Sequence, residues 1–138
     1  MTPDWKVTVS GQLVKLLSHR RCDRGMTLAD YATRCLLRGE IHELVTTDQR
    51  DASAGDRIDR VGFVGFVELE RGGVVERGDV AVADGVEFGR VLGFDDCHFP
   101  NHLNVLIESD RLLTSADIGA GVGAEIRFEP RPEGPSPE

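Results

Sequence analysis

The sequence lacks the features that mark several common classes of protein. Its three cysteines, Cys22, Cys35 and Cys97, are odd in number, widely spaced and without a C-x-x-C pair, so they provide neither a disulfide framework nor a zinc ribbon. No run is long and apolar enough to cross a bilayer, and the start "MTPDWKVTVSGQLVKLL" has no basic region followed by an apolar stretch. These absences predict a reduced, soluble, cytoplasmic protein that does not bind membranes.

Positive charge is also scarce. The chain has 16 Lys and Arg residues against 24 Asp and Glu residues, a formal net charge of -8, which repels phosphate backbones and anionic lipid surfaces. The richest basic cluster, "SHRRCDRG" at residues 18–25, is short. No nucleic-acid partner is therefore expected.

Alternating apolar residues are abundant and indicate strands. In "WKVTVSGQLVKLL" the residues Trp5, Val7 and Val9 share one parity, and Gly11 interrupts this face as a bulge or bend would. Further strand-like runs follow, separated by short turns that contain Gly and Asp. The pattern predicts a compact, mainly antiparallel β-barrel of about six to eight strands with one packed α-helix.

At 138 residues the chain fits one domain. We expect this domain to span residues 1–129 and the proline-rich segment 130–138 to be a disordered tail. The helix is predicted in "TLADYATRCLLRG", residues 27–39, where Thr27 would cap and Gly39 would stop it. Exposed strand edges would also be compatible with a homodimer.

Two familiar motifs carry little weight. "RGD" at residues 77–79 lies between two strand-like runs, where Gly78 and Asp79 are ordinary turn residues. "GAGVG" at residues 119–123 is followed by a strand and not by a helix, so it does not fit a dinucleotide-binding loop.

The richest chemistry lies in "GFDDCHFPNHLNVLIES", residues 93–109. If its second half is a strand, Leu103, Val105 and Ile107 share an apolar face, and His102 and Asn104 lie on the other face near the strand's start. Strand ends and the loops before them are common places for function in barrels. The polar candidates are Asp95, Asp96, His98, Asn101, His102 and Asn104.

Three interpretations of this segment compete. In the first, His102 or His98 is a general acid or base, Asp95 or Asp96 orients it, and Asn101 or Asn104 binds a substrate carbonyl or enolate. In the second, Cys97 and the two histidines bind a metal, with Asp95 or His42 as a further candidate ligand. Pro100 between the histidines and the adjacency of Cys97 and His98 speak against this, so no metal site is predicted. In the third, the segment only builds a turn.

The run from residue 77 to residue 109, together with "LLTSADIGAGVGAEIRF", resembles a family of small bacterial proteins of unknown function that share a G-F-D-x-x-H-x-P-N-H-L-N-like signature. A second resemblance is to the CTP-dependent riboflavin kinases, small barrels with a P-G-T-L-N motif, which "PNHLN" matches at Pro100, Leu103 and Asn104. Here His102 replaces the threonine that belongs to the nucleotide and magnesium site. The resemblance therefore implies a barrel in which this segment faces a ligand, and it speaks against kinase activity.

Together these features favour a small-molecule enzyme that works by proton transfer, as an isomerase, cyclase or lyase does, in a specialised biosynthetic pathway. No organic cofactor is expected because no cofactor motif is present. The alternative is a non-catalytic ligand-binding or accessory barrel protein.

Overall fold

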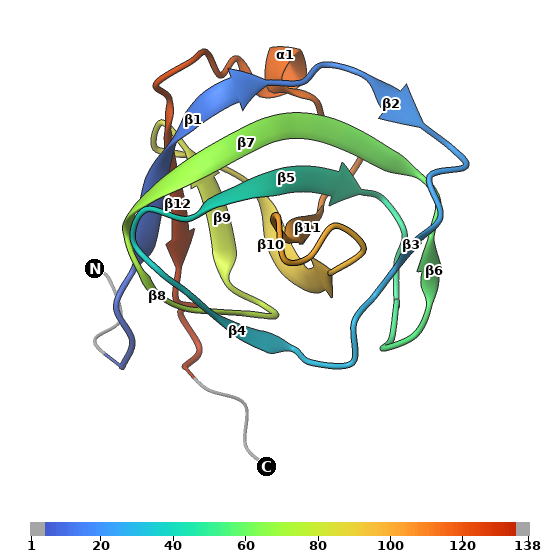
Figure 1. Cartoon of the computed structure of the whole chain (residues 1–138), viewed down its shortest axis with the longest axis horizontal. Helices are drawn as coiled ribbons and strands as arrows, with labels where there is room; N and C mark the ends of the chain where they lie inside the picture. Colours follow the sequence, from blue (N-terminus) through green and yellow to red (C-terminus); the bar gives the residue numbers. More distant parts are fainter. Residues whose placement is uncertain (1–4, 135–138) are drawn as a thin grey trace.

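Seven strands of the computed structural model, which describes residues 5–134, pair side by side until the last meets the first (Figure 1). Neighbouring strands run antiparallel, except that β11 and β5 are parallel. The fold class therefore agrees with the mainly antiparallel β-structure that the sequence predicts. In order around the ring the strands are β1 (Val9–Leu16), β12 (Glu125–Glu129), β9 (Val80–Ala83), β10 (Val86–Asp95), β11 (Asn104–Glu108), β5 (Ile41–Thr47) and β7 (Val61–Arg71), which pairs again with β1.

The interior of the ring is filled by apolar side chains. Every ring strand contributes to one buried cluster, which includes Leu13, Leu44, Phe94, Ile107 and Phe128. Burying each large side chain of this kind is worth about 1.5–3 kcal/mol. The predicted apolar face of residues 103–107 is confirmed, because Leu103, Val105 and Ile107 all belong to this cluster.

Glycines allow the ring to close where β1 and β7 cross. A Cβ on Gly11 would lie 2.2 Å from the carbonyl oxygen of Glu68, and one on Gly65 would lie 2.2 Å from that of Lys15. The register of the β1–β7 pair shifts between Ser10 and Gly11. The irregularity predicted at Gly11 is therefore confirmed, and its cause is the close approach of two backbones.

Short strands lie around the ring. β2 (Arg20–Arg21) extends β7, β3 (Met26–Thr27) pairs with β6 (Arg57–Ile58), and β4 (Thr33–Leu36) pairs with β8 (Gly73–Glu76). A second apolar cluster, which contains Met26, Val45, Ile58, Phe63 and Leu106, lies between the β3–β6 pair and the outer face of the sheet. Four ring strands, β5, β7, β10 and β11, are thus buried on both faces.

The helix predicted over residues 27–39 is wrong. That segment is extended and contains β3 and β4, and its apolar residues go to different places: Leu28 packs in the outer cluster and Leu36 in the ring interior. The backbone N–H of Thr27 donates to the Asp95 carboxylate, so Thr27 does not cap a helix. A helix would present Leu28 and Leu36 to one neighbour only, whereas the extended chain reaches both clusters.

The only helix among residues 5–134 is α1 (Ser115–Ile118). Thr114 precedes it, and the Asp117 carboxylate accepts hydrogen bonds from the Thr114 backbone N–H and hydroxyl, at 2.9 and 3.1 Å. Gly119 ends the helix in the left-handed conformation. The sequence predicts one helix, and the described residues contain one, but it is a different and shorter segment than residues 27–39.

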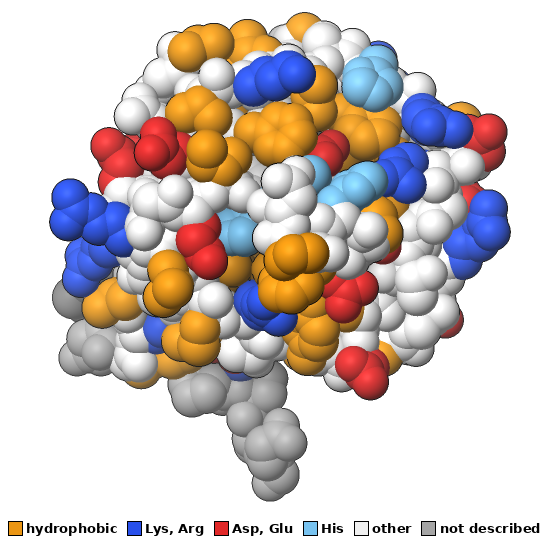
Figure 2. All heavy atoms as spheres, in the orientation of Figure 1, with side chains coloured by type: hydrophobic (Ala, Val, Ile, Leu, Met, Phe, Trp, Pro, Cys, Tyr) orange, Lys and Arg blue, Asp and Glu red, His pale blue; other side chains and the backbone are white. Residues whose placement is uncertain are grey.

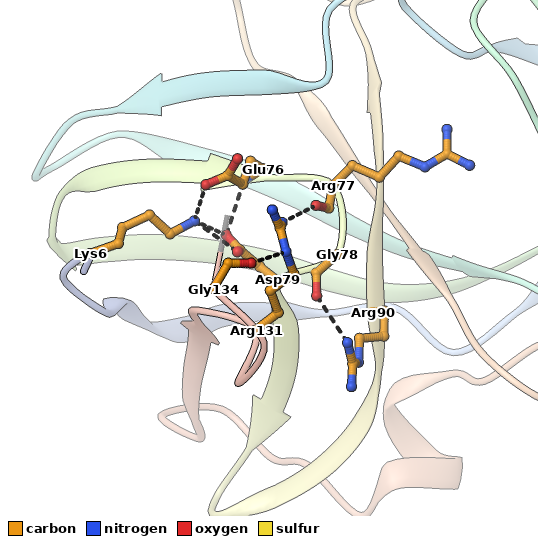
Figure 3. A network of polar contacts seen from close by, with 8 residues as sticks. All are labelled: Lys6, Glu76, Arg77, Gly78, Asp79, Arg90, Arg131 and Gly134. Carbon is orange, nitrogen blue, oxygen red and sulfur yellow. Dashed lines mark hydrogen bonds and ion pairs between the residues drawn. The ribbon is translucent and has the colours of Figure 1, made fainter. Parts of the chain in front are cut away.

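The RGD triplet is part of the turn between β8 and β9, as its flanking strands predict (Figure 3). Asp79 is fully buried, and both of its carboxylate oxygens accept hydrogen bonds at 2.7 Å from the Lys6 ammonium. The Glu76 backbone N–H also donates to Asp79. A carboxylate enclosed in this way ties the N-terminal segment to the ring and is not available to a partner.

The last described residues contact the body of the protein. The Arg131 guanidinium lies 5.6 Å from the Trp5 ring centroid and donates to the carbonyl of Gly134. This part of the predicted tail, residues 130–134, therefore has defined contacts, and residues 135–138 lie outside the described range. Within residues 5–134, no helix has the length and apolarity needed to cross a membrane.

Candidate functional site

The polar segment singled out by the sequence connects β10 to β11. Residues 97–101 form a turn that contains a cis Phe99–Pro100 peptide bond, and the turn is closed by hydrogen bonds from Phe99 to Asp96 and from Asn101 to His98. Figure 2 shows histidine side chains near the middle of the face viewed, next to basic (Lys or Arg) and hydrophobic side chains. This loop and the neighbouring outer face of the sheet form the candidate site.

Asp95 and Asn104 anchor the two ends of the loop. The buried Asp95 carboxylate accepts hydrogen bonds from the Thr27 and Cys97 backbone N–H groups and from the Asn104 side-chain amide, at 2.9, 3.1 and 3.0 Å. Burial alone would raise the pKa of Asp95, but these hydrogen bonds outweigh it and lower the pKa. Neither histidine of the loop contacts Asp95, so its observed contacts are those of a loop anchor.

One row of side chains crosses four strands on the outer face of the sheet. The cross-strand pairs are Asp95 with Asn104, Asn104 with Glu43, and Glu43 with Phe66. Residues paired directly across strands share a face, so these side chains lie side by side outside the ring. Because Leu103, Val105 and Ile107 fill the inner face of the ring, Asn104 lies on the outer face.

His102 lies against Glu43, a member of this row, and the sequence did not predict this pair. The Glu43 Oε1 atom lies 3.4 Å from His102 Nε2, and the two side chains are only 9% and 11% exposed. The contact is close enough for electrostatic attraction but is not aligned as a hydrogen bond. Phe66 packs edge-on against the His102 ring, with centroids 5.2 Å apart.

Burial acts on the two groups in opposite directions. It raises the pKa of Glu43, against the attraction of Arg24, and it lowers the pKa of His102, with help from His98 and His42. The ordinary pKa of a carboxyl group lies below that of imidazole, so these shifts bring the two pKa values closer together. A proton can then move within or through the pair at a smaller free-energy cost than in water.

Hydrogen bonds indicate where the imidazole protons lie. The Asn101 side-chain amide is 3.0 Å from His102 Nδ1, which places Nδ1 as an acceptor and the ring proton on Nε2, toward Glu43. His98 Nε2 lies 3.1 Å from the Arg24 guanidinium, which can only donate. The His98 and His102 rings are 5.0 Å apart at their centroids.

A third histidine lies at the edge of the same site. His42 is buried, its Nδ1 accepts a hydrogen bond from the Leu103 backbone N–H, and its Nε2 lies 3.1 Å from the Glu40 carboxylate. His42 and Asn101 both line a cavity of about 260 Å³. Asn101 thus contacts the imidazole of His102 and also borders this cavity.

The structure therefore brings together some of the predicted residues and separates others. His98, Asn101 and His102 are in mutual contact, Asn104 and Asp95 form a second group beside them, and the side chain of Asp96 is exposed without a hydrogen bond to any of residues 5–134. The Asn104 amide is used by Asp95, while its carbonyl oxygen is buried without a partner among the described residues.

Sequence reasoning missed Glu43 and did not place Arg24 at this site. Glu43 shares its strand parity with Ile41 and Val45, so a charged residue in the middle of an apolar strand face was a signal that the sequence contained. Arg24 offered no such signal, because its position beside His98 depends on how the segment between β2 and β3 folds.

Cys97 and metal binding can be assessed from the same geometry. Burial and the neighbouring Asp95 carboxylate raise the pKa of the Cys97 thiol, so at neutral pH it is a poor nucleophile. Within residues 5–134, no group of three or more His, Cys, Asp or Glu side chains is placed to hold a metal ion.

A larger cavity, of about 590 Å³, lies elsewhere on the ring, between the β9–β10 hairpin and the segment that follows β11. None of the residues predicted from the sequence lines it. Its lining includes Phe88 and Ile118 together with Arg50, Arg90 and Arg111.

The fold and the site together define a small β-ring protein with an imidazole and carboxylate centre on its outer face. The chain belongs to a family of unknown function, DUF6917, which matches residues 4–129. This agrees with the resemblance to an unknown-function family. No curated protein and no solved structure matches the chain.

Proposed function

We propose that this protein is an enzyme that acts on a small molecule by proton transfer, with His102 as the acid–base group. The observation that supports the proposal is the Glu43–His102 contact of 3.4 Å between two side chains that are about nine-tenths buried. A carboxylate in the middle of a buried sheet face costs stability, and the packing of the sheet gives no reason for it. A carboxylate that orients a histidine is a common acid–base arrangement.

The geometry suggests which nitrogen would react. Because Nε2 carries the proton that faces Glu43, Nδ1 is the basic nitrogen, and its present neighbour is the exposed Asn101 amide. A substrate that displaces this amide would place an acidic C–H, next to a carbonyl group, against Nδ1. Nδ1 would take that proton, Glu43 would stabilise the imidazolium, and Nδ1 would return the proton to another atom of the substrate.

Neighbouring residues would assist in different ways. Arg24 and Asn101 have donors at the solvent side of the site and could stabilise the enolate oxygen that forms. His98 holds Arg24 and packs beside His102. Asn104 and Asp95 keep the loop in place and are positioning residues.

Proton abstraction can be tested before the natural substrate is identified. A panel of small ketones and keto acids is incubated with the protein in D₂O, and exchange of the α-protons is followed by ¹H NMR. We expect exchange of at least one compound to fall about a hundredfold or more in His102→Gln and to fall also in Glu43→Gln. Glu68→Gln, on the neighbouring strand β7, is the control. Exchange that is unchanged in His102→Gln would contradict the proposal.

A second function, ligand binding without catalysis, is favoured by the 590 Å³ cavity, which has the volume of a small-molecule site. NMR mapping separates the two functions. A compound that shifts the amide signals of Phe88 and Ile118, and binds His102→Gln as tightly as the native protein, would support the binding function.

A further inference from the structure

The 260 Å³ cavity beside Asn101 has a distinctive lining. It lies where β4, the start of β5 and the 97–101 turn meet. More of its exposed surface is polar than apolar, and the charged and polar groups come mainly from four side chains, Arg34, Glu40, His42 and Asn101. The remaining lining residues are Cys35, Leu36, Ile41, Phe99, Pro100 and Leu103, which give the cavity an apolar part.

Arg34 is the unusual member of this lining. It is half-buried, and its guanidinium carbon lies 5.1 Å from the Phe99 ring centroid and 5.5 Å from that of Tyr31. Its side chain makes no hydrogen bond or ion pair with any of residues 5–134, although most arginines of this acidic chain have a carboxylate or carbonyl partner. Ring contacts hold a guanidinium in place while leaving its N–H donors free.

One further donor borders the cavity. The Asn101 amide has a second N–H besides the one directed at His102, whereas His42 Nε2 is already paired with the Glu40 carboxylate. A planar anion can use several such donors at once, and arginine pairs with carboxylates through two parallel hydrogen bonds.

We propose that this cavity binds the carboxylate of a small monocarboxylic acid with an apolar body, through Arg34. This inference rests on the proposed function, because it supplies the substrate class for the same Asn101–His102 site. The apolar body would pack on the Ile41, Phe99 and Pro100 wall, and the carbon next to a carbonyl group would extend past Asn101 toward His102.

The charge of the cavity favours a single negative charge on the ligand. Glu40 lies in the same cavity, and a hydrogen bond from the Leu37 backbone N–H lowers its pKa, so it is ionised at neutral pH. One arginine and one carboxylate leave little net attraction for a phosphate dianion, whereas the directed donors of Arg34 suit a monoanion.

The test measures the affinity of hexanoate, hexanamide and inorganic phosphate by titration of ¹H–¹⁵N NMR spectra. We expect hexanoate to shift the amide signals of Ile41, His42 and Asn101, hexanamide to bind at least about tenfold more weakly, and phosphate to bind more weakly than hexanoate. Arg34→Met should weaken hexanoate binding by about tenfold or more.

Two variants sharpen the result. Arg38→Met removes an exposed arginine from the same segment outside the cavity, and it should leave hexanoate affinity unchanged. Glu40→Gln keeps an acceptor for Leu37 and His42 but removes the repelling charge, so it should tighten hexanoate binding. An effect of opposite sign in Arg34→Met and Glu40→Gln cannot come from unfolding.

Hexanoate that causes no shift at concentrations that saturate a millimolar site would overturn the carboxylate inference. Equal binding of hexanoate and hexanamide, tighter binding of phosphate, or full affinity in Arg34→Met would do the same. None of these results concerns proton abstraction, which the D₂O exchange assay measures with His102→Gln. If His102→Gln left the rate of α-proton exchange unchanged while hexanoate still bound, only the proposal of catalysis would fail.

Discussion

At the scale of single residues, Glu43 shows the tension between stability and function. Its carboxylate lies 3.4 Å from His102 Nε2 and makes no hydrogen bond to any described residue, and the charges of Arg24 and Asp95 act on it in opposite directions. A buried ionised carboxylate without hydrogen bonds costs free energy, which folding must recover elsewhere. Residues of this kind are common at active sites, where the local cost of stability serves the chemistry.

We therefore predict that Glu43→Gln stabilises the protein at neutral pH by about 1 kcal/mol. Burial raises the pKa of Glu43 in the folded state. Its contribution to stability is thus fully present below the pKa of the unfolded chain and is lost as the pH rises through the folded pKa. Glutamine cannot ionise, so its advantage should be present at about pH 7.5 and disappear near pH 4.

Urea unfolding of the native protein and Glu43→Gln at both pH values checks this prediction. Glu68→Gln, a carboxylate on β7 that is more exposed, controls for the general effect of removing a charge from an acidic protein. A Glu43→Gln protein that is less stable than the native one at neutral pH would show that the Glu43 carboxylate stabilises the fold.

At the scale of elements, the sequence predicts the strands well because each strand's pattern is local. Alternating apolar residues identify the runs that become β1, β5, β10, β11 and β12, since side chains of a strand point to opposite faces in turn. The prediction of a helix over residues 27–39 is wrong because it, too, used only the local pattern. Its apolar spacing fits a helical stripe, but two separate clusters, one inside and one outside the ring, determine where Leu28 and Leu36 lie.

The candidate site is predictable in part on the same terms. The 93–109 segment is contiguous, so its histidines and asparagines can be identified from the sequence alone. Glu43 reaches His102 through the parallel pairing of β5 with β11, and Arg34 reaches the cavity because β4 pairs with β8. Pairings between distant strands cannot be read from a local period.

Asp95, the last residue of β10, is hydrogen-bonded to β3 through Thr27 and to β11 through Asn104. Its removal should therefore destabilise the protein. Asp95→Ala leaves three donors without their acceptor, from Thr27, Cys97 and Asn104. At about 1 kcal/mol for each net hydrogen bond, the loss is about 3 kcal/mol. Asp95→Asn keeps one acceptor oxygen and should cost less.

Chemical denaturation gives these free energies, and Asp96→Ala is the matched control. Asp96 is the next residue along the chain, exposed and without a side-chain hydrogen bond to any described residue. The substitution Asp96→Ala should change the free energy of unfolding by no more than about 0.5 kcal/mol. If Asp95→Ala and Asp96→Ala lowered stability equally, Asp95 would not be the anchor of the loop.

At the scale of the whole molecule, closure of the ring determines where function can lie. The interior is packed with apolar side chains from all seven strands, so the cavities of 260 and 590 Å³ lie at its periphery. The two cavities share no lining residue. The 260 Å³ cavity beside the 97–101 turn and the 590 Å³ cavity can therefore be altered separately by substitution.

Closure also makes the last strand essential. β12 pairs with β1 on one side and β9 on the other, and it places Ile126 and Phe128 in the ring interior. A chain that ends after Gly123 would expose two strand edges and the apolar interior between them, which favours aggregation. We predict that this truncated chain shows no cooperative unfolding transition in urea and elutes as aggregates in size-exclusion chromatography.

A chain that ends after Glu129 keeps β12 and loses the Arg131–Trp5 contact, worth about 1 kcal/mol, so it should remain monodisperse and unfold cooperatively. Cooperative unfolding of the shorter chain would mean that the remaining six strands are stable without closure.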